Sequence, residues 1–181
     1  MVLLESRYDT LKQGNNALDF TLTSVNGRKF TFSDAEGYSG YLIIFMCNHC
    51  PYVQPKMESV VKLQEEFPKI MFIGINANTN PEYPEDSFEK MEEYADKWSL
   101  NFDYLIDETQ EIAKKYGATC TPDPFLFNAK KELVYHGRFD PEHGKASDCK
   151  DMRDAIKKML AGKKVSDDKM FSLGCSIKWN K

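Results

Sequence analysis

The sequence contains no apolar run approaching the roughly 20 residues that a membrane-crossing helix needs. Near its start, Glu5 and Arg7 interrupt the apolar residues before a segment of signal-peptide length can form. The net charge of −4 argues against nucleic acid as a partner, because nucleic-acid-binding proteins present basic patches. We therefore expect a cytoplasmic protein that binds neither a membrane nor nucleic acid.

Cysteine is also scarce. The five cysteines are odd in number and unlike the disulfide scaffold of a secreted protein. The chain has 181 residues and a hydrophobic fraction of 41%, enough for a core of its own. We expect residues 1–181 to form a single domain. Within it, 1–16 would be an N-terminal arm without firm secondary structure and 163–181 an extended C-terminal tail.

Two cysteines lie in the run Cys47-Asn48-His49-Cys50-Pro51. The apolar segment 41–46 before it predicts a buried strand, and apolar residues at helical spacing follow it. A strand-to-helix turn offers unpaired N–H groups and the positive end of the helix dipole, which favour a thiolate. Thiolates attack disulfides, and a second thiol can resolve the mixed disulfide. The motif predicts dithiol–disulfide exchange, with Cys47 attacking from the exposed start of the helix.

Two other interpretations of the cysteine pair compete with dithiol exchange. A zinc site needs two further ligands, and the remaining histidines and cysteines contain no second close pair. A purely structural role is the other alternative, since buried thiols are common in protein cores. Neither explains the position of the pair between a strand and a helix. We expect no metal and no cofactor.

Along the chain, Asn26-Gly27 predicts the turn of a hairpin between 20–23 and 29–32. Pro55 predicts a kink, or a restart of the helix that follows the cysteines. Further strands are expected at 70–75, 102–106, 125–127 and 133–135, with helices at 88–98, 107–116 and 152–160. This order predicts an α/β fold, a central mixed sheet flanked by helices.

These segments resemble the thioredoxin-like fold, in its peroxiredoxin-like and TlpA-like branch (the AhpC/TSA, or redoxin, group). The residues that carry the resemblance are 45–53, Asp107 to Gln110, Cys120 to Asp123 and the tail 174–179. They are similar to a subgroup with a Cys-Asn-His-Cys motif. The resemblance implies an N-terminal β-hairpin extension, a redox-active disulfide and antioxidant activity.

The resemblance also implies roles for particular residues. Cys47 matches the attacking cysteine and Cys50 the resolving one. Pro122 matches a cis-proline facing the pair, and Thr121 and Pro51 match positions that contact a substrate strand. His49 matches a position where related oxidoreductases also carry histidine. The alternative for His49 is a solvated histidine with no electronic role.

The expected function is thiol–disulfide exchange with protein or small-molecule disulfides, supported by a thiol reductant or a reductase. A thiol peroxidase using Cys47 is the first alternative, and a redox-inactive binding module is the second. Peroxiredoxins carry threonine three residues before the reactive cysteine, where this chain has Ile44, so no hydroxyl is expected there. The strand 41–46 also lacks the buried acid that accepts a proton in thioredoxin.

The other three cysteines lie outside the motif. Cys120 lies two residues before Pro122 and is interpreted as a core residue. Cys149 is expected at the surface, at the start of a helix. Cys175 lies in the C-terminal tail, where an accessory thiol is one interpretation.

Overall fold

The computed structural model describes residues 3–166 and 170–180. Residues 1–2, 167–169 and 181, the remaining parts of the predicted arm and tail, lie outside the described residues. The central sheet has seven strands in the order β3-β2-β6-β5-β4-β8-β9. Their bounds are β2 (Thr21–Ser24), β3 (Lys29–Thr31), β4 (Gly40–Phe45), β5 (Ile70–Asn76), β6 (Asp103–Ile106), β8 (Asp123–Asn128) and β9 (Leu133–His136).

The sheet is mixed, as the sequence predicted. Strands β4, β5 and β6 are parallel, and β8 runs antiparallel to β4. The predicted N-terminal hairpin is β2–β3, whose turn contains Gly27 in the left-handed conformation. This hairpin joins the edge of the sheet through pairing of β2 with β6. The fold class is therefore confirmed: a thioredoxin-like α/β fold with an N-terminal hairpin extension.

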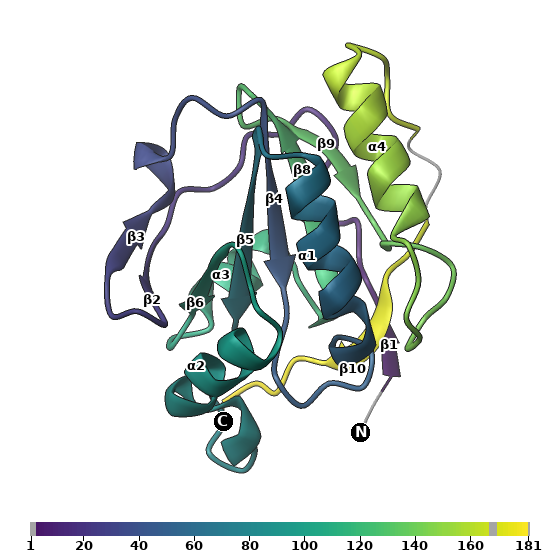
Figure 1. Ribbon diagram of the computed structural model, residues 1–181. Coiled ribbons are helices and arrows are strands. Elements are labelled where there is room, and N and C mark those ends of the chain that lie inside the picture. The colour runs from purple at the N-terminus through teal and green to yellow at the C-terminus, as the bar shows by residue number, and fades with distance from the viewer. Residues whose placement is uncertain (1–2, 167–169, 181) are drawn as a thin grey trace.

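Helices cover both faces of the sheet. They are α1 (Met57–Glu66), α2 (Phe88–Lys97), α3 (Glu111–Tyr116) and α4 (Lys150–Leu160). In Figure 1, α1 and α4 cross the near face and α3 lies behind the sheet. Side chains of β4 alternate between the two layers, with Leu42 and Ile44 facing α1 and Ile43 and Phe45 facing α3. Because both faces of β4 are buried, its sequence is an unbroken apolar run.

Strands near the two ends of the chain join an internal strand in a second, smaller sheet of order β1-β10-β7. Its strands are β1 (Leu3–Glu5), β7 (Cys120–Thr121) and β10 (Leu173–Ser176). The expectation of an arm without firm structure is wrong for β1. The arm gains its backbone partners only when β10 docks, so its own sequence gives little strand signal. Figure 1 shows the tail, in yellow, crossing below the ends of the central strands.

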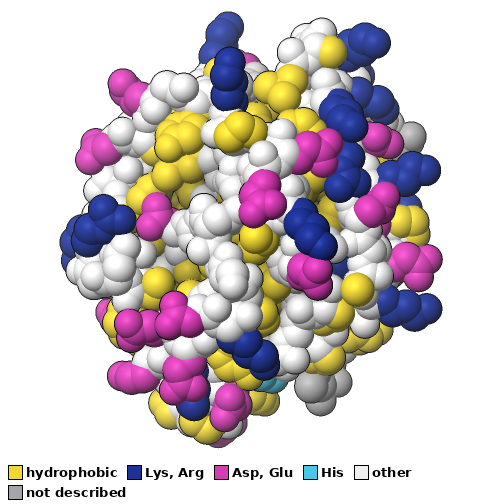
Figure 2. Space-filling view, viewed as in Figure 1, with side chains coloured by type: hydrophobic (Ala, Val, Ile, Leu, Met, Phe, Trp, Pro, Cys, Tyr) yellow, Lys and Arg dark blue, Asp and Glu magenta, His cyan; other side chains and the backbone are white. Residues whose placement is uncertain are grey.

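The surface in Figure 2 carries charges of both signs, with lysine and arginine gathered over α4. Acidic side chains lie between the basic ones on this face. Among the described residues, none of the helices combines the length and apolar character required to cross a membrane.

Candidate active site

The two cysteines of the motif lie directly beyond the end of β4, opposite the segment that joins β7 to β8. The Thr121–Pro122 bond is cis, as predicted from the resemblance. The Sγ atom of Cys47 lies 3.4 Å from Thr121 Oγ1, and the Cys50 thiol donates to the Thr121 carbonyl oxygen at 3.2 Å. The fold thus brings together residues more than 70 positions apart in the chain.

The helix after the motif begins later than the sequence suggested. Cys50 O accepts hydrogen bonds from Val53 N and Gln54 N, which closes a turn. A 3-10 helix, η2 (Gln54–Lys56), follows with Pro55 in its first turn, and α1 starts only at Met57. Of the predicted kink or restart, the structure shows a restart, which begins at Gln54, one residue before Pro55. The cysteines are therefore not at the N-terminus of α1, and Pro51 is exposed on the turn.

Both thiols are fully buried, which contradicts the exposed position predicted for Cys47. The loop, the Thr121 segment and the tail cover the sulfur atoms, and none of these long-range contacts can be read from the motif. Cys149 is also buried, directly before α4, and not at the surface as expected. Cys120 lies in the core as interpreted, and burial raises its pKa.

His49 is paired with a carboxylate that sequence reasoning did not identify. Its Nδ1 lies 2.5 Å from Oδ2 of Asp86, at the end of the 3-10 helix η3 (Pro84–Asp86). The interpretation of His49 as a solvated residue is wrong, since only 17% of its side chain is exposed. The strand 41–46 indeed lacks an acid, but the fold supplies one from the loop after β5.

Asp86 also organises the cysteine loop. Its Oδ1 accepts hydrogen bonds from Asn48 N at 2.8 Å and His49 N at 3.1 Å. Its Oδ2 also accepts from Asn78 Nδ2 at 3.0 Å. Asp86 lies 37 positions from His49, in a polar stretch that reads only as loop, so nothing local singles it out.

The pair with Asp86 changes the acidity of His49. The hydrogen bond from the ring to the carboxylate raises the pKa of His49 above its usual value, although burial opposes it. The ring stacks on Tyr83, with centroids 5.6 Å apart. Its Nε2 is buried and has no hydrogen-bond partner in the part of the chain that the structure describes. The protonated form of His49 is thus favoured, and its Nε2 is not engaged by any described residue.

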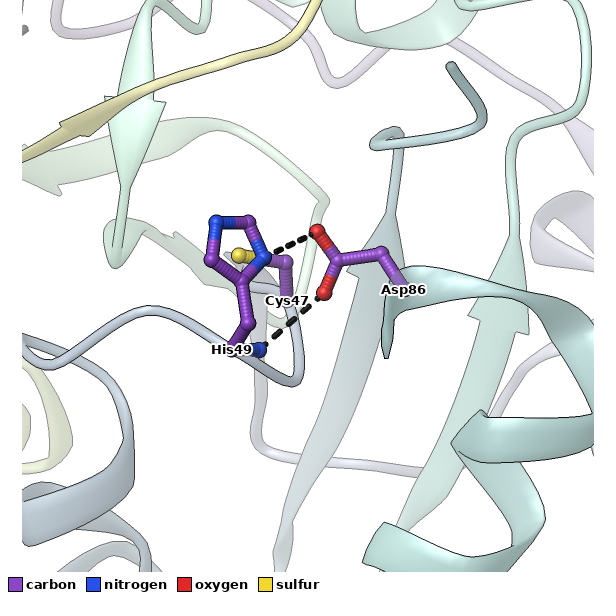
Figure 3. A group of neighbouring side chains, drawn as sticks. All are labelled: Cys47, His49 and Asp86. Carbon is purple, nitrogen blue, oxygen red and sulfur yellow. Dashed lines mark hydrogen bonds and ion pairs between the residues drawn. The ribbon is translucent and has the colours of Figure 1, made fainter. Parts of the chain in front are cut away.

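Cys47, His49 and Asp86 each place one possible metal-ligand atom within 4.8 Å of the other two. Figure 3 shows the Cys47 sulfur and the His49 ring on the same side of Asp86, whose carboxylate is bonded to both the ring and the backbone of His49. Zinc accepts all three ligand types. Here, however, the ring nitrogen and the carboxylate oxygen are bonded to each other, so these atoms form an ion pair and not an open set of ligands.

The two motif thiols differ in acidity. Burial raises the pKa of Cys47 well above its ordinary value. The pKa of Cys50 is lowered because the thiols of Cys175 and Cys47 hydrogen-bond to its sulfur. The surroundings therefore favour the thiolate of Cys50 over that of Cys47, whereas the sequence predicted the thiolate at Cys47. The reason is Cys175, whose contact with the pair depends on the docking of the tail.

A dithiol after the central strand, facing a cis-proline segment on a mixed sheet, defines a protein of the thioredoxin-like class. Within that class, the chain belongs to the AhpC/TSA family, whose model matches residues 13–136.

Relatives share both fold and sequence with this chain. An uncharacterized conserved protein from Geobacillus kaustophilus superimposes with a TM-score of 0.92 and 38% identity, covering 99% of this chain and 97% of that one. The thioredoxin-like protein YneN of Bacillus subtilis (strain 168) is 27% identical, covering 66% of this chain and 68% of its own. The thiol-disulfide oxidoreductase ResA of Geobacillus thermodenitrificans (strain NG80-2) is 25% identical, covering 71% and 72%.

Proposed function

We propose that this chain forms a single domain and acts as a thiol–disulfide oxidoreductase, exchanging electrons with protein disulfides through Cys47 and Cys50. The observation that carries the proposal is the position of both thiols against Thr121 and the cis-proline Pro122. Relatives named as thiol-disulfide oxidoreductases support the reaction type. A cytoplasmic setting, with a thiol reductant or a reductase as partner, would supply the electrons that restore the dithiol after each exchange.

The exchange has two steps. The Cys47 thiolate attacks one sulfur of the substrate disulfide, which forms a mixed disulfide and releases the other sulfur as a thiolate that takes up a proton. The Cys50 thiolate then attacks Cys47 Sγ, which forms the Cys47–Cys50 disulfide and releases the second substrate thiol. Two electrons pass to the substrate, and two electrons from the reductant restore the dithiol.

The pair His49–Asp86 serves this reaction through charge. Protonated His49 lies close enough to Cys47 to stabilise its thiolate, and the Asp86 carboxylate keeps the ring protonated and oriented. The buried Nε2 offers a proton to the departing substrate thiolate. Thr121 contributes its hydroxyl to Cys47 and its backbone to a substrate strand, with Pro122 and Pro51 shaping that surface.

Peroxidase activity is a weaker candidate, although one argument against it needs correction. The sequence predicted that no hydroxyl would be available near Cys47, yet Thr121 Oγ1 lies 3.4 Å from its sulfur. That hydroxyl reaches Cys47 from another segment of the fold, which local spacing could not reveal. Because Cys47 is fully buried, a peroxide would need an opened site just as a protein substrate does.

The test is reduction of insulin disulfides by the full chain with dithiothreitol as reductant, run beside a measurement of peroxide consumption. Wild type should accelerate insulin precipitation, and Cys47→Ser should abolish the acceleration. Cys50→Ser should trap mixed disulfides, because the releasing attack is lost. Cys149→Ser is the matched control, a buried cysteine away from the pair that should retain activity. Full insulin reduction by Cys47→Ser would refute the proposal, as would peroxide consumption without insulin reduction.

A further inference from the structure

The C-terminal strand β10 lies where a substrate strand was expected. It pairs antiparallel with β7, so that Cys175 faces Thr121 and Ser176 faces Cys120. Beyond the strand, Ile177 N donates to Thr119 O at 3.0 Å. The backbone edge that the resemblance assigns to substrate is therefore occupied by the protein's own tail.

The docking of this strand is tight and depends on glycine. A Cβ atom at Gly174 would lie 1.9 Å from the carbonyl oxygen of Thr121, a distance that no side chain can adopt. Anchors hold the tail on both sides of Cys175. Ser172 Oγ donates to Pro122 O at 2.6 Å, and Lys178 N donates to Asn78 Oδ1 at 2.9 Å. Asn78 in turn binds Asp86, which links the tail to the His49 pair.

This register brings a third thiol to the dithiol. Cys50 lies 3.2 Å from the carbonyl of Thr121, the residue that Cys175 faces across the ladder. In agreement with this register, the Cys175 and Cys47 thiols lie near enough to the Cys50 sulfur to lower its pKa. Cys47, Cys50 and Cys175 also belong to one buried cluster, closed to solvent. Cys50 thus shares its surroundings with both other thiols, and exchange requires an attacking thiol near one sulfur of a disulfide.

We propose that Cys175 is a third redox-active thiol. It attacks Cys50 in the Cys47–Cys50 disulfide and forms a Cys50–Cys175 disulfide. This inference rests on the proposed function, because that reaction supplies the first disulfide. It goes beyond it by assigning a catalytic residue and a second oxidised state.

The step is an internal exchange. Cys175 attacks Cys50 Sγ as its thiolate, and the proton that it gives up is taken up by the departing Cys47 sulfur. The Cys50–Cys175 bond forms, the Cys47–Cys50 bond breaks, and Cys47 leaves as a thiolate beside the hydroxyl of Thr121. One disulfide is present before and after the step, so no further oxidant or reductant is consumed.

The second disulfide has a structural consequence. A Cys50–Cys175 bond would fasten β10 over Thr121 and keep the substrate edge closed until a reductant acts. In the reduced protein only non-covalent contacts hold the tail. When the tail departs, Cys50 loses its contact with Cys175, which is the main cause of its lowered pKa.

The decisive experiment uses the full-length Cys47→Ser variant, which cannot form the Cys47–Cys50 bond. The reduced variant is treated with oxidised glutathione, quenched in acid, alkylated and digested with trypsin without reduction. We expect mass spectrometry to find the peptide carrying Cys50 linked to the peptide carrying Cys175. Glutathione first joins Cys50, and the Cys175 thiolate then displaces it.

Two further variants make the result specific. Cys47→Ser/Cys175→Ser should lose the linked peptides, whereas Cys47→Ser/Cys149→Ser should keep them. Cys47→Ser/Gly174→Ala should lower their yield, because the added Cβ displaces β10 from Thr121. Circular dichroism establishes that each variant is folded.

The inference is overturned if folded Cys47→Ser carries glutathione on Cys50 but shows no link to Cys175. It is also overturned if oxidised wild type contains the Cys47–Cys50 disulfide alone after equilibration. The insulin assay tests the proposed function separately. Full reduction of insulin by Cys47→Ser would refute that function, whichever disulfides the peptide analysis finds.

Discussion

The described part of the chain contains two histidine–aspartate pairs of similar length but different surroundings. His49 and Asp86 are 2.5 Å apart and belong to loops beyond the ends of β4 and β5. His136 Nε2 and Asp123 Oδ1 are 2.7 Å apart and join the neighbouring strands β9 and β8. The first pair adjoins the reactive thiols. The second is enclosed by rings, with His136 stacked on Phe125 at a centroid distance of 3.7 Å.

The pairs also differ in what else binds the carboxylate. Asp86 accepts hydrogen bonds from two backbone N–H groups and the Asn78 amide in addition to His49. For Asp123, the structure leaves Oδ2 without a hydrogen-bond partner among the described residues, and burial raises its pKa. Asp86 can therefore hold its loop without the histidine, whereas the buried carboxylate of Asp123 depends on His136 for its hydrogen bond. We therefore expect the core pair, His136 and Asp123, to govern stability, and the loop pair, His49 and Asp86, to govern activity.

The largest effect is expected from breaking the core pair. His136→Phe keeps a ring against Phe125 but leaves Asp123 buried without its partner. We expect a loss of about 3 kcal/mol in the free energy of unfolding. His49→Phe is the matched change in the loop pair and should cost at most about 1.5 kcal/mol, because Asp86 keeps its other donors. Urea unfolding of the two variants measures the difference, and equal losses would contradict the comparison.

For activity, we expect the loop pair to matter more than the core pair. Asp86→Asn removes the charge that holds His49 protonated and weakens the contacts of the cysteine loop. We expect the rate of insulin reduction to fall about tenfold, equivalent to about 1.4 kcal/mol in the barrier. Asp123→Asn should change the rate per folded molecule by less than about twofold, well under that energy. A larger loss of rate in Asp123→Asn would show that the core pair also serves the reaction.

The third prediction concerns pH. The pKa of His49 is raised in the folded protein because Asp86 binds its ring, so folding favours the protonated form. The stabilisation is complete below the unfolded pKa of about 6.5 and is lost as the pH rises through the folded value. The stability difference between wild type and His49→Gln should therefore be largest in mildly acidic solution and shrink above neutrality. Urea unfolding across this range, with histidine resonances followed by NMR, tests the sign.

The smallest effect is on the redox potential. His49→Ala removes a positive charge near Cys47 and should raise the pKa of its thiol. The dithiol is then less stabilised, and the potential should become more negative, by up to about 20 mV. Equilibration of both proteins with glutathione buffers measures the shift. A change towards a more positive potential would mean that His49 does not stabilise the thiolate.

The local sequence predicted the strands of the central sheet and the helices that cover it, but not β1 of the smaller sheet. The apolar run 41–46 fixed a strand buried on both faces, and Asn26-Gly27 fixed the turn of the hairpin. Pro55 located the restart before α1. These features follow from local conformational preferences and from the periodicity of side chains, which a short segment carries within itself. The cis bond at Pro122 came from the resemblance and is present.

The surroundings of the two thiols follow from the tertiary structure alone. Asp86 reaches His49 across 37 positions, and the Thr121 hydroxyl reaches Cys47 across 74. Cys175 meets Cys50 only because β10 pairs with β7. Such contacts depend on how distant segments pack, and polar loop residues carry no periodicity that reveals their partners. The sequence therefore identified the dithiol, while burial, the buried carboxylate and the third thiol are properties of the folded chain, because each arises from contacts between segments far apart in sequence.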